Sequence, residues 1–192
     1  MTRLLPLALA AAALTTPAFA EPVKYDLDPS HSQIAFSYNH LGFSTTTGIF
    51  GGFTGTILFD QEAPANSSVE VSFPVTSMLT GWAERDAHFM TADFFDPAKG
   101  ETVTFKSTKI EVTGEKTGLI TGDLTMNGMT KEVVLDAVLN QAGVHPMMNQ
   151  DWAGFSATTT LIRSEWGLGM FAPYVGDEVA IEISIEAGKA AE

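Results

Sequence analysis

Apolar and polar residues alternate one by one over several stretches of this chain, and this period of two constrains the fold more than any other feature. In residues 179–186, Val179, Ile181, Ile183 and Ile185 alternate with mostly polar neighbours. Residues 34–39, 69–75 and 103–106 show the same pattern. Successive side chains of a β-strand point to opposite faces, so each stretch predicts a strand with one face in an apolar interior and the other in water.

Further strands are predicted at residues 45–50, 54–59, 119–126, 131–139 and 155–162. Asn127-Gly128 stands between two of them and is typical of a tight hairpin turn, while Gly51-Gly52 indicates a sharp bend. Many short strands without a parallel crossover pattern favour an antiparallel barrel or sandwich. A barrel of about eight strands has room for one small ligand when side chains do not fill it.

Residues 1–20 have the three parts of a secretory signal peptide: Arg3 near the start, an apolar run over residues 4–14, and the small residues Ala18 and Ala20 at a cleavage site. The alternative is a buried N-terminal helix, which Pro6 and Pro17 would interrupt. We expect residues 21–192 to form one exported domain, soluble after cleavage, because no later apolar run is long enough to span a membrane.

The composition narrows the function classes. A formal net charge of -13 argues against a nucleic-acid partner and against adhesion to anionic lipid surfaces. The chain has no cysteine, which excludes disulfides and thiolate chemistry. The four histidines are dispersed without metal-binding spacing, so we predict neither a metal site nor a cofactor.

Motifs spread along the chain resemble the YceI-like family of exported polyisoprenoid-binding proteins. The most specific are ERDAHF at residues 84–89 and DFFD at residues 93–96; others lie at residues 28–32, 39–43, 122–128, 163–167 and 175–179. The resemblance implies a mainly β fold, an extended lipocalin-like antiparallel barrel of about eight strands with one short helix. It also implies a periplasmic location and a lumen that binds a long amphiphile, such as a polyprenyl phosphate or an isoprenoid quinone.

The inward faces of the predicted strands supply candidate lining residues for such a lumen. They are Ile34, Phe36, Tyr38, Val71, Phe73, Phe105, Leu124, Phe155 and Ile183. Alternation alone leaves two interpretations open, since a filled barrel and a hollow one both need apolar inward faces. The resemblance implies that these side chains line a bound lipid.

Two connections, residues 141–151 and 165–177, are rich in methionine and aromatic residues. The candidates for a mouth in these loops are Met147, Met148, Trp166, Met170 and Phe171. Flexible methionine and amphipathic aromatic side chains suit a mouth that admits irregular apolar chains. The alternative is that these loops pack on the end of the barrel.

Residues 81–90 form the one stretch that favours a helix, with Thr80 as its predicted N-cap. Arg85, Asp86 and His88 on this helix allow three interpretations. Arg85 and His88 could bind a lipid head group, His88 could act as a general base with a carboxylate to orient it, or Arg85 and Asp86 could seat the helix on the barrel.

Two further residues are candidates for the head group. His40 lies at the end of a predicted strand, where a barrel rim is expected. Arg163 also ends a strand, and pairing with a nearby carboxylate is the alternative for it.

The leading hypothesis is a periplasmic carrier or sequestering protein that buries an isoprenoid-type lipid without turnover, with no catalytic residue. An edge strand or the helix could serve a homodimer. One rival is a lipid-modifying enzyme that uses His88 and Asp86, although no nucleophile motif such as G-x-S-x-G is present. The other rival is a filled barrel that binds no ligand and serves as a stress or docking module.

Overall fold

The computed structural model describes residues 21–191, so the predicted signal peptide lies outside the described residues. The described chain forms ten strands, three short 3-10 helices and one α-helix. In order they are β1 (Val23–Leu27), β2 (Gln33–His40), β3 (Ser44–Phe50), β4 (Thr54–Phe59), η1 (Pro64–Asn66), β5 (Ser68–Pro74), η2 (Val75–Ser77), α1 (Ala83–Phe89), β6 (Thr102–Val112), β7 (Thr117–Met126), β8 (Met129–Val144), β9 (Asp151–Ile162), η3 (Arg163–Trp166) and β10 (Glu178–Lys189).

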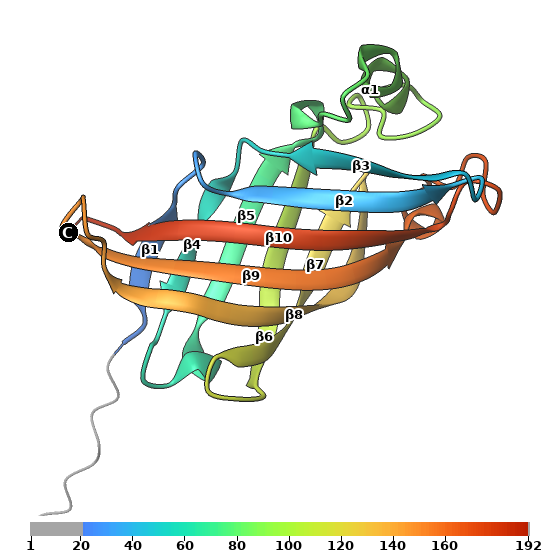
Figure 1. Ribbon diagram of the computed structural model, residues 1–192. Helices are drawn as coiled ribbons and strands as arrows, with labels where there is room; N and C mark the ends of the chain where they lie inside the picture. The colour runs from blue at the N-terminus through green and yellow to red at the C-terminus, as the bar shows by residue number, and fades with distance from the viewer. Residues whose placement is uncertain (1–20, 192) are drawn as a thin grey trace, which may run out of the picture.

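Strand β10 closes the barrel by sharing one of its edges between two partners. Its first half pairs with β2, and its last residues pair with β1 through Tyr25↔Lys189 and Leu27↔Ala187. β1 in turn pairs with β4, and neighbours follow in order through β9, which pairs with β10. β1 and β4 to β10 therefore form a closed antiparallel ring, and the β2–β3 hairpin extends from it (Figure 1). The predicted barrel of about eight strands with one short helix is confirmed.

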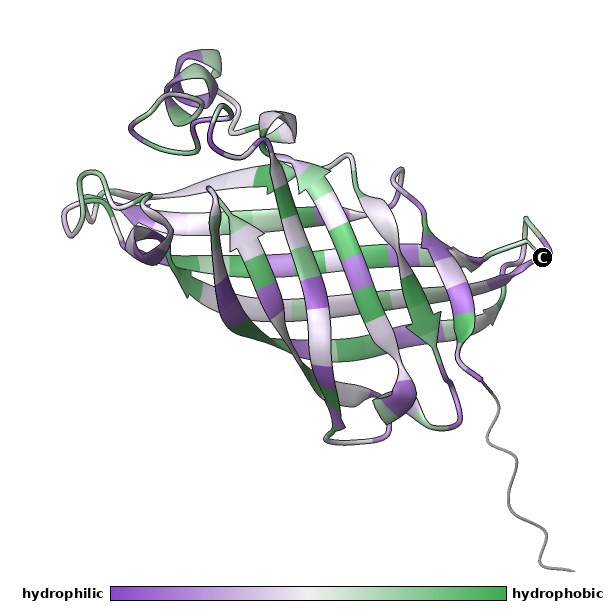
Figure 2. Cartoon of the chain, turned by 180° about the vertical axis from the view of Figure 1, so that it is seen from behind, coloured by the Kyte–Doolittle hydropathy of each residue, from purple (hydrophilic) through white to green (hydrophobic). Residues whose placement is uncertain are grey.

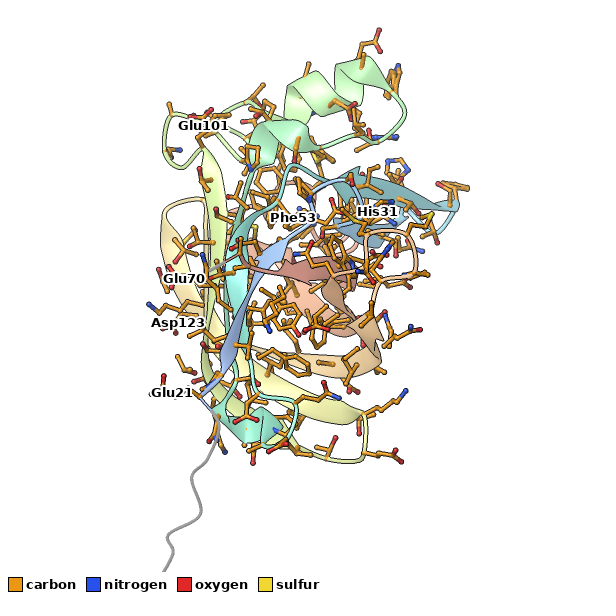
Figure 3. All side chains as sticks on the ribbon, turned by 90° about the vertical axis from the view of Figure 1, so that its left-hand side faces the viewer. Glu21, His31, Phe53, Glu70, Glu101 and Asp123 are labelled. Carbon is orange, nitrogen blue, oxygen red and sulfur yellow. The ribbon has the colours of Figure 1, made fainter. Side chains whose placement is uncertain are left out.

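The alternating pattern determines which side chains face inward. Along β10, Val179, Ile181, Ile183 and Ile185 are each more buried than the residues on either side of them in the strand. Figure 3 shows Glu70 of β5 and Asp123 of β7 on the outer side of the wall and Phe53 on the inner side. The β7–β8 turn is the expected hairpin: Asn127 and Gly128 have φ of 51° and 72°, and Met126 pairs with Met129.

The structure corrects three local expectations. β1 was not predicted. The predicted connection at 141–151 is shorter, residues 145–150, because β8 and β9 stay paired as far as Val144↔Asp151. The prediction of Thr80 as N-cap is wrong: Trp82 occupies that position and makes no side-chain cap. The Thr80 hydroxyl is instead hydrogen-bonded to Arg85 and Asp86.

Two glycines let large rings lie flat against the inner wall. A Cβ on Gly48 would stand 2.3 Å from the ring of Phe36 on the neighbouring strand, and a Cβ on Gly122 would stand 2.4 Å from the ring of Phe105. Each ring therefore covers wall that a second side chain would otherwise occupy. Because the two aromatic rings lie against the wall, space remains along the barrel axis.

Candidate functional site: an apolar lumen in two chambers

The barrel is hollow, with an almost wholly apolar interior in two chambers. The main chamber has a cavity volume of about 250 Å³ and extends between β4–β7 on one side and β8–β10 on the other. The α1 chamber, of about 100 Å³, lies under the helix and is lined by Phe89, Phe94, Phe95 and Leu168, among others. The choice between a filled and a hollow barrel, which alternation left open, is therefore decided for a hollow one.

The structure places all nine candidate lining residues on these walls. Phe36 and Tyr38 line the α1 chamber. The main chamber is lined by the other seven, Ile34, Val71, Phe73, Phe105, Leu124, Phe155 and Ile183. Because the two sets come from six different strands, the walls form only when the barrel closes.

Four residues line both chambers and form the partition between them: Phe50, Met126, Leu161 and Ile181. Phe50 is the centre of an aromatic cluster, with ring centroids 5.3 Å from Phe36, 5.2 Å from Phe73 and 5.9 Å from Phe95. Sequence reasoning did not select these four residues. The same alternation could have found Leu161 and Ile181, which share a strand face with Phe155 and Ile183.

The main chamber reaches the surface beside the β6–β7 turn. Its lining there includes Pro64 and Ser67 from the loop before β5, together with the exposed Glu115 and Lys116 of the turn. The sequence did not indicate that these residues border an opening, because a charged turn is typical of any solvent-exposed loop. A ligand with a polar end could meet either charge at this opening.

The candidate mouth residues do not form one mouth. Met147 and Met148 lie in the β8–β9 loop and are 87% and 58% exposed. Trp166, Met170 and Phe171 lie beyond the other end of β9, and Trp166 is buried in the core. The two loops stand at opposite ends of the same strand, so they cannot border one opening.

Arg85 and Asp86 are engaged within the polypeptide. The Arg85 guanidinium donates to the Thr80 hydroxyl at 2.8 Å and to the Thr80 carbonyl at 2.6 Å. Asp86 accepts hydrogen bonds from the Thr80 backbone N–H, at 3.0 Å, and from its hydroxyl. These bonds give the pair a structural role, as the third interpretation expected, but they tie the helix to the segment that precedes it and not to the barrel strands.

His88 is exposed and stands beside the α1 chamber. Its Nε2 is 3.6 Å from Asp93, and its ring packs edge-on against Phe94, a lining residue of that chamber. Its carboxylate neighbour is therefore Asp93, and the His88–Asp86 pair that a catalytic interpretation requires is not formed. His40, at the end of β2, is also exposed.

Arg163 holds the β9–β10 connection in place. Its buried guanidinium donates only to backbone carbonyls of the β9–β10 connection: Leu168, Met170 at 2.9 Å, Val175 at 2.9 Å and Gly176 at 2.8 Å. Burial lowers the pKa of Arg163 from its usual value, and the Asp177 charge opposes this effect. The nearby Asp177 carboxylate accepts its hydrogen bonds from the N–H and hydroxyl of Ser164, at 2.9 and 2.7 Å.

One group within residues 21–191 brings potential metal ligands together: Asp28, His31 and Glu186, whose ligand atoms lie within 4.8 Å of one another. The Asp28 carboxylate is 2.6 Å from His31 Nδ1, and this hydrogen bond raises the pKa of His31. Glu186 accepts a hydrogen bond from the Trp152 indole at 2.9 Å. A metal ion would have to compete with these bonds and with the proton on His31.

Comparison with known proteins connects this barrel to a family. The model of the YceI-like domain matches residues 25–187. The chain belongs to the YceI-like family. A UPF0312 protein of Ectopseudomonas mendocina is 38% identical over 180 residues, 94% of each chain, and one of Pseudomonas putida is 39% identical over 151 residues, 79% of this chain and 78% of that one.

Solved structures agree on the fold. The Campylobacter jejuni YCEI protein superposes with a TM-score of 0.72 at 27% identity, over 80% of this chain and 90% of its own. Burkholderia cenocepacia BcnA gives a TM-score of 0.76 at 24% identity, over 84% and 99%. A polyisoprenoid-binding domain from Saccharophagus degradans gives 0.66 at 12% identity, over 88% and 99%, and at that identity the likeness concerns the fold alone.

Among residues 21–191, no helix combines the length and the apolar character needed to cross a membrane.

Proposed function

We propose that this member of the YceI-like family is a periplasmic carrier or sequestering protein that buries a long isoprenoid-type lipid, such as a polyprenyl phosphate or isoprenoid quinone, in its two chambers. The observation that carries the proposal is the hollow apolar lumen. Each buried CH2 of a tail contributes about 0.8 kcal/mol without any directional partner. Binding therefore needs only a dry tunnel of sufficient bore.

Two further observations support a binding role without turnover. The structural neighbour from Saccharophagus degradans is described as a polyisoprenoid-binding domain. Within the described chain, the groups that a lipid-modifying enzyme would use are either engaged in structural bonds, as Asp86 is, or exposed outside the lumen, as His88 is. The signal-peptide pattern of residues 1–20 supports the proposed periplasmic location.

The test is mass spectrometry of a solvent extract from the purified protein, with uptake of an added isoprenoid quinone measured in parallel. We expect a co-purified amphiphile or stoichiometric uptake. Failure of both would refute lipid binding. Conversion of the bound lipid by the wild-type protein, abolished in His88→Ala, would instead favour the enzyme.

A matched pair of variants connects uptake to the lumen. Ala157 on β9 lines the main chamber, whereas its neighbour Thr158 is exposed on the outer face. Ala157→Phe places a phenyl ring in the chamber and should abolish uptake of a long tail. Thr158→Phe adds the same ring outside and should leave uptake unchanged. If Ala157→Phe takes up the ligand as well as Thr158→Phe does, the ligand does not bind in the main chamber.

The polar head group has two available positions. His88 and His40 are exposed on the α1 side, and Lys116 is exposed at the rim of the main chamber. For a polyprenyl phosphate, loss of affinity in His88→Ala would assign the head group to the α1 side. Loss in Lys116→Ala would assign it to the β6–β7 rim.

A further inference from the structure

Four large apolar side chains project into solvent from two loops, and together they are called the apolar tip. Leu41 and Phe43 lie in the β2–β3 turn and are 47% and 90% exposed. Phe171 and Tyr174 lie in the β9–β10 connection and are 55% and 77% exposed. Nothing in the barrel core requires them, because the inner walls are made by other residues.

The two loops lie side by side. His40 forms an isolated bridge with Val175, and the Gly176 N–H donates to the Asn39 carbonyl at 2.8 Å. In Figure 1 both loops protrude together from the right-hand end of the long strands, and Figure 2 shows green, apolar segments in them from behind. The tip is therefore a protruding feature built from two parts of the chain.

The backbone holds two of these residues in a conformation that apolar side chains rarely adopt. Leu41 has φ of 57° and Phe171 has φ of 65°, both in the left-handed region. A bulky residue other than glycine is strained there, and such strain clusters at sites where the chain binds something. Glycine or asparagine would be the unstrained choice in a loop that only reverses direction.

The tip also lacks charge in a strongly acidic protein. The chain has a net charge of -13, yet residues 41–43 and 167–176 contain no charged side chain. By contrast, the loop at residues 60–67 carries Asp60 and Glu62, and the turn at 113–116 carries Glu115 and Lys116. The tip can therefore enter an apolar medium without burying a charged side chain, as can the β8–β9 loop at residues 145–150, which lies at the other end of β9.

We propose that the apolar tip docks the protein on the surface of an electrically neutral lipid bilayer, where lipid passes between the membrane and the chambers. The tip adjoins the wall of the α1 chamber: the ring of Phe171 lies 6.4 Å from that of Phe94, which lines this chamber. Aromatic and aliphatic side chains at a protruding tip suit the interfacial region of a bilayer. The proposal rests on the proposed function in assuming that the bound lipid comes from a membrane.

The size and shape of the tip favour a bilayer over a second copy of the chain. A stable protein interface buries about 800 Å² on each partner and involves about 20–30 residues a side. Four side chains on two protruding loops do not supply such a surface. A bilayer accepts a small convex tip because it has no fixed shape to match.

The test is co-sedimentation of the purified protein with phosphatidylcholine vesicles that contain no isoprenoid. We expect the wild-type protein to bind, and the double variant Phe43→Ser/Tyr174→Ser to bind about tenfold more weakly, because two exposed apolar groups no longer leave water. Including phosphatidylglycerol in the vesicles should weaken binding, since the protein is acidic. The matched control is Met147→Ser, equally exposed but in the β8–β9 loop at the other end of β9.

Two outcomes of the vesicle experiment would overturn the inference: no binding by the wild-type protein, or equal loss in Met147→Ser. Light scattering without vesicles covers the remaining case, because a stable dimer that Phe43→Ser dissociates would make the tip a protein interface. Uptake of a quinone dispersed in ethanol separates this inference from the proposed function. If vesicle binding fails while uptake persists, only the docking inference is lost. If uptake fails while vesicle binding persists, the lipid-carrier proposal is lost together with the passage of lipid at the tip, while docking of the tip on the bilayer stands.

Discussion

Phe50 separates the two chambers, and its removal makes the sharpest prediction about the lumen. The side chain is 8% exposed and lines both cavities. Phe50→Ala should join them into one longer tunnel while it removes three aromatic contacts, with Phe36, Phe73 and Phe95. The variant should therefore be less stable than the wild type and should bind longer tails more tightly.

The loss of stability follows from the packing. Phe→Ala in a filled core costs about 3–5 kcal/mol, and the three ring pairs would each account for about 0.5–1.5 kcal/mol beyond their area. Parts of the Phe50 ring already face unfilled space, so fewer contacts are lost than in a solid core. We expect a loss near the lower limit, about 3 kcal/mol, measured by urea unfolding of the protein without ligand.

The same substitution should increase the affinity for ligands with longer tails. With the partition removed, a longer tail can be buried, and each additional CH2 contributes about 0.8 kcal/mol. A series of isoprenoid quinones of increasing tail length should show affinity that continues to rise in Phe50→Ala after it has levelled off in the wild type. Val75→Ala is the control, because Val75 is fully buried and lies outside the lining of both chambers. A stability loss below about 1 kcal/mol, or an unchanged length preference, would refute this account of the partition.

Three further predictions concern the framework around the lumen. Arg163→Met should cost about 3 kcal/mol or more in urea unfolding, because the four carbonyls it binds lose their donor; a variant as stable as the wild type would contradict the structural role. Hydrogen bonds from Ser164 hold the pKa of Asp177 below its ordinary value, so ionised Asp177 stabilises the fold above about pH 4 and this contribution disappears as the pH falls through the lowered pKa. Asp177→Asn should therefore lose less stability than the wild type between pH 7 and pH 3, and identical acid profiles would exclude the effect. Gly128→Ala should cost about 1 kcal/mol in thermal or urea unfolding, because φ is 72° while the added Cβ would meet its nearest neighbour, the Lys99 carbonyl, at an ordinary 3.5 Å.

Local patterns predicted much of the wall. Side-chain direction in a strand depends only on position along that strand, so alternation was enough to place Phe36, Phe105 and Ile183 on the inner face. The Asn127-Gly128 turn was equally readable, because its positive φ angles favour those two residue types wherever they occur. The resemblance to the YceI-like family, carried by residues such as 84–89, added the barrel topology.

The site was less predictable, because the role of a polar side chain near α1 depends on its hydrogen-bond partners, and the sequence does not show which partners lie close to it in the fold. Arg85, Asp86 and Arg163 had the right chemistry for a head group. In the structure, Thr80 engages the first two, and the β9–β10 carbonyls engage the third. A charged side chain close to unsatisfied backbone groups is held by them, and only the folded chain determines which groups those are.

The sequence by itself determined every strand except β1, together with their inward faces and one hairpin, since these depend on neighbours within a few residues. The tertiary structure alone decided that β10 closes the ring through β1 while the same edge of β10 also pairs with β2, and that the lumen is hollow and divided at Phe50. It also separated Met147 from Phe171 at opposite ends of β9. The physical reason is that an internal volume is the difference between the space a closed ring encloses and the side chains that fill it. That difference depends on rings such as Phe36 lying over glycine on the neighbouring strand, and a pairing across strands leaves no trace in the local period of the sequence.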